Sequence, residues 1–318
     1  MIAGGLVSWA AAQHGDRPSL VFGDQVLSHA DVERLSNRWA QALLALGLAP
    51  GERVAVLLDN SVHSVASVFG VEKAALTYVA LNARHTLAEQ LDVLADAEPA
   101  AVIVGPAFVS LAQAFADPAT TGLPGLRHVL VIGLESGLAG LPAVTGLQSL
   151  DTLLAAASDA PPRLSIEPGH VQRIAYTSGT TGRAKGVVYT AERTQQRLHN
   201  HFLAMEYGLS VDDAMLHVGP LTHAAGVYLF PCFLRGARNI VLERFEPQAL
   251  FDAVQRHRVT HLMLVPTMMA RLVEALEGGL QADLSSLRRI HYGTAPTPVT
   301  LIRRALRVFG PSCASSTA

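Results

Sequence analysis

Cysteine, excess charge and long apolar runs are all scarce in this sequence. Its 318 residues include two cysteines, Cys232 and Cys313, which form no CxxC or other zinc-type spacing. A chain of this length buries enough apolar surface to fold without disulfides or metal ions. The formal net charge is −2, whereas a dedicated nucleic-acid-binding protein normally carries a basic excess. We therefore expect a protein of a reducing, cytoplasmic compartment with no nucleic-acid partner.

Apolar segments long enough to cross a membrane are also missing, although the mean hydropathy is +0.30. The longest candidate covers residues 224–234, contains Pro231 and is closed by His223 and Arg235. Because a membrane-spanning helix needs roughly 20 residues, no span is predicted. The N-terminus lacks the basic region of a secretory signal peptide, since the first Lys or Arg is Arg17.

Two common catalytic motifs are absent as well. The sequence contains neither H-E-x-x-H nor G-x-S-x-G, so it supports neither a zinc protease nor an α/β-hydrolase nucleophile. His199 and His201 are two residues apart on a predicted helix and therefore face different directions. They are interpreted as a solvated helix surface, and no metal site is predicted.

What the sequence does contain is an alternation of short apolar runs with segments of helical period. Strands are predicted at residues 54–58, 100–104, 129–132, 174–176, 186–189, 240–242 and 261–265. Asn60 and Ser61 offer an N-cap for a helix from Val62, and Thr190 caps a helix that closes at Gly208. This pattern predicts an α/β fold with mostly parallel sheets.

The domain division follows from a change in composition. Residues 134–162 are rich in Gly, Ala, Ser and Pro and are interpreted as a linker-like excursion. A soft boundary is placed near residue 165, which gives a first α/β subdomain at 1–165 and a second at 166–318. The two could interleave in sequence.

Residues 176–186 carry the most chemical information. This segment, which joins two predicted strands, contains four Ser and Thr side chains, three glycines and a lysine. A triphosphate favours this combination, because glycines let backbone N–H groups approach its oxygens and an ammonium offsets its charge. The segment is not a Walker A loop, since Lys185 follows Ala184 and precedes Gly186. On composition alone, a ligand-free hairpin turn stays equally open.

The string itself resembles the phosphate-loop signature of the adenylate-forming superfamily, which includes acyl-CoA synthetases, luciferases and peptide-synthetase adenylation domains. Ala184 departs from it, because the family usually has proline there. Residues 17–23, 50–55, 78–82, 220–226, 265–267 and 293–296 resemble further family segments in the same order, although Ala80 and Ala83 replace customary prolines. The chain is most similar to the N-terminal region of an acyl-CoA synthetase.

This resemblance implies two stacked αβα subdomains with mostly parallel sheets, the C-terminal domain being absent. It assigns the second subdomain the phosphate loop, whose contacts to the β- and γ-phosphates of ATP would come from Thr177, Ser178, Gly179, Thr180, Thr181, Gly182 and Lys185. The adenine and the acyl-pocket wall would be lined by Gly293, Thr294, Ala295 and Pro296. His223 would lie where carboxylate and phosphate meet, so His223 and Lys185 are the catalytic candidates.

The resemblance further implies an AMP-forming carboxylate:CoA ligase that uses ATP, Mg²⁺ and CoA. Residues 222–225 offer no aspartate to anchor a substrate amine, which favours a plain carboxylic acid, with a fatty acid as the first choice. The alternatives are a non-catalytic nucleotide- or acyl-binding fragment and an amino-acid or aryl-acid adenylation domain. The oligomeric state, a homodimer included, stays open.

The end of the chain departs from the family pattern. The expected Tyr-Gly-x-Thr-Glu motif, ribose-binding aspartate and C-terminal lysine do not follow Pro296, so the 318-residue chain is expected not to complete acyl-CoA formation. Residues 311–318 suggest a single-base frameshift near codon 311, since one back-translation read in the neighbouring frame ends in Tyr-Gly. The alternative is an arbitrary boundary with an appended tail.

Overall fold

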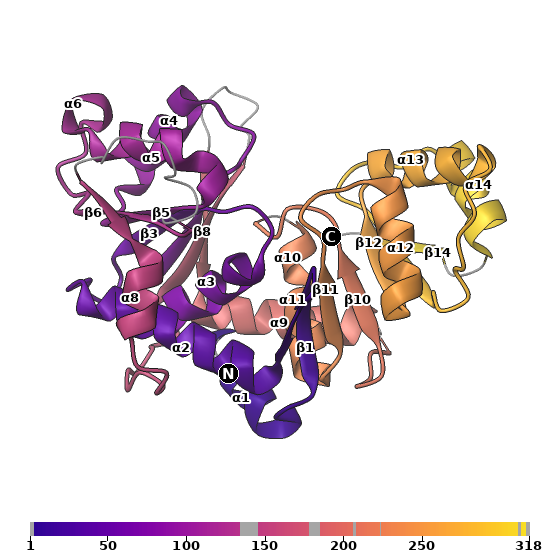
Figure 1. Cartoon of the computed structure of the whole chain (residues 1–318), viewed down its shortest axis with the longest axis horizontal. Helices are drawn as coiled ribbons and strands as arrows, with labels where there is room; N and C mark the ends of the chain where they lie inside the picture. Colours follow the sequence, from indigo (N-terminus) through magenta and orange to yellow (C-terminus); the bar gives the residue numbers. More distant parts are fainter. Residues whose placement is uncertain are drawn as a thin grey trace. The chain divides into compact units, whose positions relative to one another are not determined.

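The computed structural model describes residues 3–133, 146–177, 185–205, 208–222, 224–310 and 313–315. By its internal contacts the chain forms two compact units that interleave in sequence. Unit 1 contains Met1–Ser8, Glu33–Asp59 and His63–Arg197, and unit 2 contains Trp9–Val32, Asn60–Val62 and Leu198–Ala318. Figure 1 shows each unit built around its own sheet.

The sheet of unit 1 has the strand order β7-β6-β5-β3-β4-β8-β9. Its strands are β3 (Arg53–Leu57), β4 (Thr77–Ala80), β5 (Ala101–Val104), β6 (His128–Val131), β7 (Leu147–Ser149), β8 (Val171–Thr177) and β9 (Lys185–Thr190). All neighbours are parallel except the β8–β9 hairpin at one edge. The fully buried central strands explain why β3 and β5 read as continuous apolar runs.

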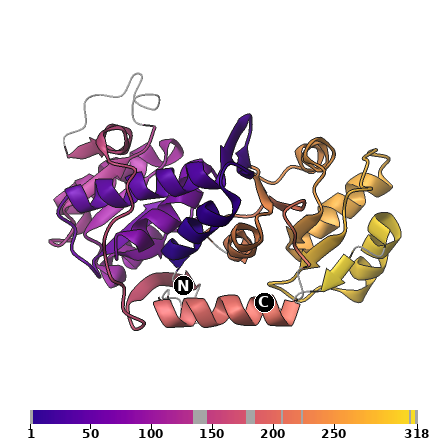
Figure 2. The ribbon, with the colours of Figure 1, turned by 90° about the horizontal axis from the view of Figure 1, so that it is seen from below.

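Several of the described helices lie wholly or partly in unit 1. They are α1 (Ala3–His14), α2 (His29–Ala45), α3 (Val62–Lys73), α4 (Leu87–Ala97), α5 (Val109–Ala116), α6 (Pro118–Thr121), α8 (Leu150–Ala156) and α9 (Ala191–Met205), with a 3₁₀ turn at Pro106–Phe108. Val93 of α4 and Phe115 of α5 share one apolar cluster with the side chains of β3–β6. The chain passes between the units within α1, α2 and α9 and on either side of Asn60–Val62. Figure 2 shows α9 as one continuous helix.

The sheet of unit 2 has the order β14-β13-β12-β10-β11-β1-β2. Its strands are β1 (Pro18–Phe22), β2 (Gln25–Ser28), β10 (Ala214–His217), β11 (Arg238–Val241), β12 (His261–Leu264), β13 (Arg289–Tyr292) and β14 (Cys313–Ser315). Only β1 and β2 pair in antiparallel fashion. Both sheets are therefore mostly parallel, as the sequence predicts.

The helices of unit 2 cover both faces of its sheet. They are α10 (Ala224–Val227), α11 (Leu229–Arg235), α12 (Pro247–His257), α13 (Pro266–Glu277) and α14 (Val299–Phe309). Leu216 and Leu264 pack with α12, α13 and α14, whereas Met215 and Met263 pack with Cys232 of α11 on the other side. This alternation is the period of two that a strand imposes.

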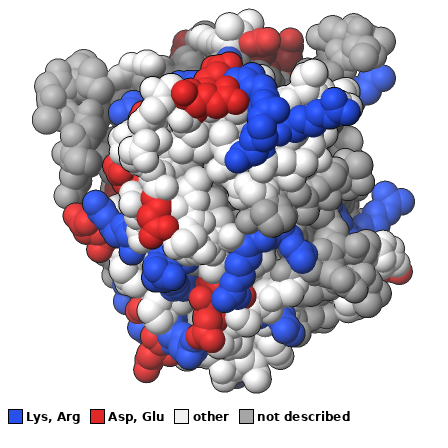
Figure 3. Space-filling model, turned by 90° about the vertical axis from the view of Figure 1, so that its right-hand side faces the viewer, with Lys and Arg blue, Asp and Glu red and all other residues white. Residues whose placement is uncertain are grey.

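Surface charges on α13 and α14 are mixed in sign. Arg304 of α14 forms an ion pair with Glu277 of α13, with a shortest N–O distance of 2.6 Å. Figure 3 shows positive and negative side chains interspersed on the face of the molecule at the α13–α14 end of Figure 1.

No helix in the described part of the chain is long and apolar enough to span a membrane.

One sequence-based interpretation differs from the structure, and the domain boundary stays a prediction. Residues 134–162 are not linker throughout, because β7 pairs with β6 and Ser149 caps α8 through its hydroxyl; residues 134–145 lie outside the described part. Residues 171–190 follow the boundary placed near residue 165, yet β8 pairs with β4 in the sheet of unit 1. The domain boundary at residue 165 stays a prediction. In the structure, β8 and β9 follow residue 165 in sequence and extend the sheet of unit 1.

Candidate functional site

Three of the sequence motifs leave the same edge of the unit 2 sheet. Residues 218–222 follow β10, residues 265–267 follow β12 and residues 293–296 follow β13. These three strands are parallel, and β12 lies between the other two. With a strand spacing of about 4.8 Å, the segments after β10 and β13 start roughly 10 Å apart. The carboxyl ends of parallel strands are where α/β folds bind ligands.

The segment after β13 presents backbone to this edge. The Gly293 N–H donates to the carbonyl of Leu264 at the end of β12, at 3.4 Å. Thr294 has a φ of +67°, a left-handed conformation that costs a non-glycine residue of the order of 1 kcal/mol. Thr294, Ala295 and Pro296 are exposed, and Gly293 is half-buried. The residues predicted to line an adenine and an acyl group are thus accessible at the sheet edge.

The predicted phosphate loop belongs to unit 1. Its last described residue before the loop, Thr177, pairs directly with Lys185, the first residue of β9. Lys185 is exposed, so its ammonium is accessible at the mouth of the hairpin. Residues 178–184, which include the predicted ligands Ser178, Gly179, Thr180, Thr181 and Gly182, lie outside the described residues.

Two contacts brace the base of this hairpin. The hydroxyl of Tyr176 donates to Oδ2 of Asp96 on α4 at 2.5 Å, and burial together with this hydrogen bond raises the pKa of Tyr176. A Cβ atom added to Gly186 would lie 2.8 Å from Ile174 and 3.2 Å from the Tyr176 ring. Glycine at position 186 therefore lets β9 approach the tyrosine closely.

Comparison with known proteins identifies the family. The sequence model of the AMP-binding enzyme family matches residues 7–316. This chain belongs to the AMP-binding enzyme family. It is 32% identical over 308 residues to an indoleacetate–CoA ligase of Aromatoleum aromaticum, covering 95% of this chain and 57% of the relative. It is 28% identical over 313 residues to the medium/long-chain-fatty-acid–CoA ligase FadD8 of Mycobacterium tuberculosis, covering 97% and 52%. The chain thus spans just over half the length of these relatives.

Solved structures of the family share the fold. The inhibitor-bound N-terminal domain of FACL13 from Mycobacterium tuberculosis has a TM-score of 0.83 at 25% identity and covers 100% of this chain and 75% of that one. ATP-bound MatB from Rhodopseudomonas palustris has a TM-score of 0.82 at 25% identity, covering 100% and 60%. The chain is an acyl-CoA ligase-like member of the family, and its fold matches the N-terminal domain region.

Some site predictions fall outside what the structure describes. His223, the histidine predicted at the meeting point of carboxylate and phosphate, is one of them, and the described chain resumes at α10. His199 is exposed, as predicted for a solvated helix surface. Among the described residues, no group of three or more His, Cys, Asp or Glu could hold a metal ion.

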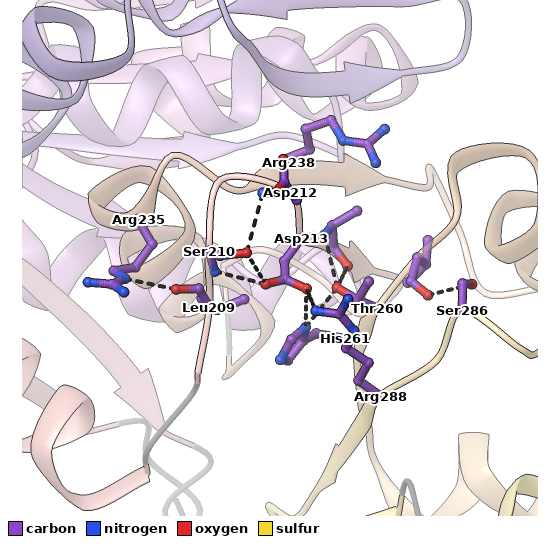
Figure 4. A network of polar contacts seen from close by, with 12 residues as sticks. Leu209, Ser210, Asp212, Asp213, Arg235, Arg238, Thr260, His261, Ser286 and Arg288 are labelled. Atoms are coloured by element: carbon purple, nitrogen blue, oxygen red, sulfur yellow. Dashed lines mark hydrogen bonds and ion pairs between the residues drawn. The ribbon is translucent and has the colours of Figure 1, made fainter.

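A polar network at the amino edge of the unit 2 sheet is structural. Figure 4 shows Asp213 accepting from Ser210 and Arg288, with the Asp213–Arg288 distance at 3.0 Å. Burial alone would raise the pKa of Asp213, but the hydrogen bonds from Ser210 and from Thr260 outweigh burial and lower it. Because these residues precede β10, β12 and β13, the network fixes strand register at the edge away from the three motifs.

Sequence reasoning missed two residues that support the site segments. Asp96 gives no local signal, since its partner Tyr176 is 80 positions away. Asn60 was interpreted as a helix N-cap candidate, yet its side chain bonds instead to the segments that follow β10 and β11. The available signal for Asn60 was a polar residue close to the end of a buried strand, since it lies three positions after Leu57.

Proposed function

We propose that this chain provides the adenylation part of an AMP-forming carboxylate:CoA ligase. In the first step a carboxylate oxygen attacks the α-phosphorus of ATP, the bond to the β-phosphate oxygen breaks, and acyl-AMP and pyrophosphate form. In the second, the thiol of CoA attacks the acyl carbon, AMP leaves and the thiol proton is released. The first step depends on positioning and on neutralising the charge of the leaving pyrophosphate.

The observation that carries the proposal is the convergence of three motif segments at the carboxyl edge of the unit 2 sheet. Parallel pairing of β10, β12 and β13 gathers residues that are more than 70 positions apart in sequence. In the proposal, His223 meets the substrate carboxylate, and residues 293–296 line the adenine and the acyl group. Thr177 and Lys185, which face each other across the β8–β9 hairpin, bind the β- and γ-phosphates with the intervening loop.

The proposed substrate is a plain carboxylic acid that is apolar apart from its carboxyl group. Residues 222–225 contain no carboxylate that could pair with a substrate amine, and an unpaired buried ammonium is strongly disfavoured. A fatty acid is the first candidate. An arylacetic acid is the second, and the relative that is named for indoleacetate favours it.

The test measures ATP–pyrophosphate exchange with the 318-residue chain, together with calorimetric binding of ATP and of acyl sulfamoyl adenosines, which mimic acyl-AMP. Octanoyl, indoleacetyl and phenylalanyl mimics form the panel. We expect ATP binding and a preference for the octanoyl or indoleacetyl mimic. Binding without carboxylate-dependent exchange would indicate a binding fragment. Preference for the phenylalanyl mimic would favour amino-acid activation, and absence of all binding would contradict the proposal.

A further inference from the structure

The side chain of Asn60 contacts three backbone groups of unit 2. Its Nδ2 donates to the carbonyls of Gly219 and Leu242, both at 3.0 Å. Its Oδ1 accepts from the N–H of Leu221 at 3.0 Å. Asn60 is 6% exposed, so water competes little for these bonds. Both amide hydrogens and the amide oxygen are used, which no carboxylate, hydroxyl or apolar side chain could reproduce.

These three backbone groups lie at the carboxyl ends of two neighbouring strands. Gly219 and Leu221 belong to the segment that leaves β10, and Leu242 directly follows β11. The N–H of Leu242 donates to the carbonyl of His217 at 3.0 Å, which continues the pairing of β10 with β11. Asn60 therefore ties the segment that leads to His223 to the end of the adjacent strand.

Gly226 lies close to the same segment, on the carbonyl side of Leu221. A Cβ atom added to Gly226 would lie 2.0 Å from the carbonyl oxygen of Leu221 and 3.0 Å from its carbonyl carbon. These are backbone atoms, and carbon–oxygen contacts this short do not occur without displacement. The N–H of Leu221 is thus bonded to Asn60, and its carbonyl lies so close to Gly226 that any larger residue at position 226 would displace Leu221.

We propose that Asn60 is a positioning residue that fixes the backbone of residues 219–222, which lead to His223 in the sequence, and that Gly226 leaves the room this backbone needs. Neither residue touches substrate in this proposal, which rests on the proposed function for the role of His223. A segment leaving a sheet edge has no strand partner of its own, and a misplacement of about 1 Å at a reacting group can cost a hundredfold in rate. Asn60 supplies the missing constraint through side-chain bonds to the backbone.

The experiment compares Asn60→Asp with Asn239→Asp in the 318-residue chain. Aspartate keeps the acceptor for Leu221 but places a carboxylate oxygen against the carbonyls of Gly219 and Leu242. Asn239 is also fully buried in unit 2 and bonds to His217 and Ser19 within the sheet. The control variant therefore removes a buried amide from the same unit without touching the segment.

The first measurement is amide hydrogen exchange across residues 219–226 without ligand. In the wild type we expect the Leu221 N–H to be protected although it lies outside any strand. Asn60→Asp should raise its exchange rate at least tenfold, and Asn239→Asp should change it less than threefold. If Asn60→Asp does not fold, Gly226→Ala serves as the second variant with the same expectation. An unprotected Leu221 N–H in the wild type, or unchanged exchange in the variants, would overturn the proposal that Asn60 fixes this segment.

The second measurement is ligand binding, which tests the positioning role of Asn60 separately from the proposed function. Asn60→Asp should weaken binding of the octanoyl sulfamoyl adenosine ten- to a hundredfold. It should change binding of ATP less than threefold, because the proposed function assigns the ATP phosphates to the β8–β9 hairpin. Faster exchange with unchanged binding of the mimic would overturn the positioning role. If the wild type binds neither ligand, the proposed function fails, while the exchange data still decide whether Asn60 fixes the segment.

Discussion

Replacing Glu72 with glutamine should change how the stability of unit 1 depends on pH. Glu72 lies on α3, and its side chain is 2% exposed. Its Oε1 is 3.9 Å from Arg173 on β8, and no described residue forms a hydrogen bond to its Oε2. Burial raises the pKa of Glu72 to about 7, although the positive charge of Arg173 opposes the shift.

The magnitude follows from linkage between protonation and folding. The folded protein binds the Glu72 proton more tightly than the unfolded chain, so the contribution of this group is favourable at low pH and is lost as pH rises through about 7. With a pKa near 4.5 in the unfolded chain and about 7 in the folded one, the free energy of unfolding should fall by about 2.5 kcal/mol between pH 5 and pH 8. Glutamine cannot titrate, so the variant should lack this decrease.

The assay is urea unfolding at pH 5 and pH 8, followed by the fluorescence of Trp39. This tryptophan is fully buried in unit 1, and a Trp9→Phe background removes the other tryptophan of the chain. Relative to the wild type, Glu72→Gln should be more stable at pH 8 than at pH 5 by about 2.5 kcal/mol.

The matched control is Glu89→Gln. Hydrogen bonds from Thr86 lower the pKa of Glu89 below its ordinary value, so Glu89 contributes little to the change in stability between pH 5 and pH 8. This variant should keep the pH dependence of the wild type. An identical pH dependence in Glu72→Gln and the wild type would refute the reasoning, because it would mean that Glu72 is ionised at pH 5 in the folded protein.

Three further predictions concern packing, backbone conformation and charge. Gly70→Ala should destabilise unit 1 by roughly 1–3 kcal/mol in urea unfolding, because the added carbon would lie 2.3 Å from a side-chain carbon of α2, which outweighs a helix-propensity gain of about 1 kcal/mol. Arg258→Gly should stabilise unit 2 by roughly 0.5–1 kcal/mol, because φ at Arg258 is +48° and glycine adopts this conformation without strain. Arg256→Gly, within α12, should destabilise unit 2 by a similar amount. Changes in stability of the same sign for the two variants would contradict this prediction. Lys185→Ala should weaken ATP binding about ten- to a hundredfold through a lost charge-assisted contact of roughly 1.5–3 kcal/mol, and Arg183→Ala less than threefold; equal losses would refute the role of Lys185.

Much of the local structure could be predicted because its causes are local. The apolar run at residues 54–58 corresponds to β3, and the run at 100–104 corresponds to β5, since strands buried on both faces are apolar throughout. The N-cap prediction for Thr190 is confirmed by the hydrogen bond from the Arg193 N–H to its hydroxyl, at 3.3 Å. The motif strings likewise identified the family, because their chemistry is written in consecutive residues.

The tertiary structure alone decided which strands share a sheet and what holds the candidate site. β1 and β2 join the unit 2 sheet from the beginning of the chain, and β8 and β9 join the unit 1 sheet from beyond residue 165. No periodicity encodes such pairings, because a strand presents the same backbone donors and acceptors to any neighbour. Asn60 illustrates the same limit: its partners are 159 to 182 positions away, so only the folded backbone could direct its amide to the segment that carries His223 instead of to the helix it precedes.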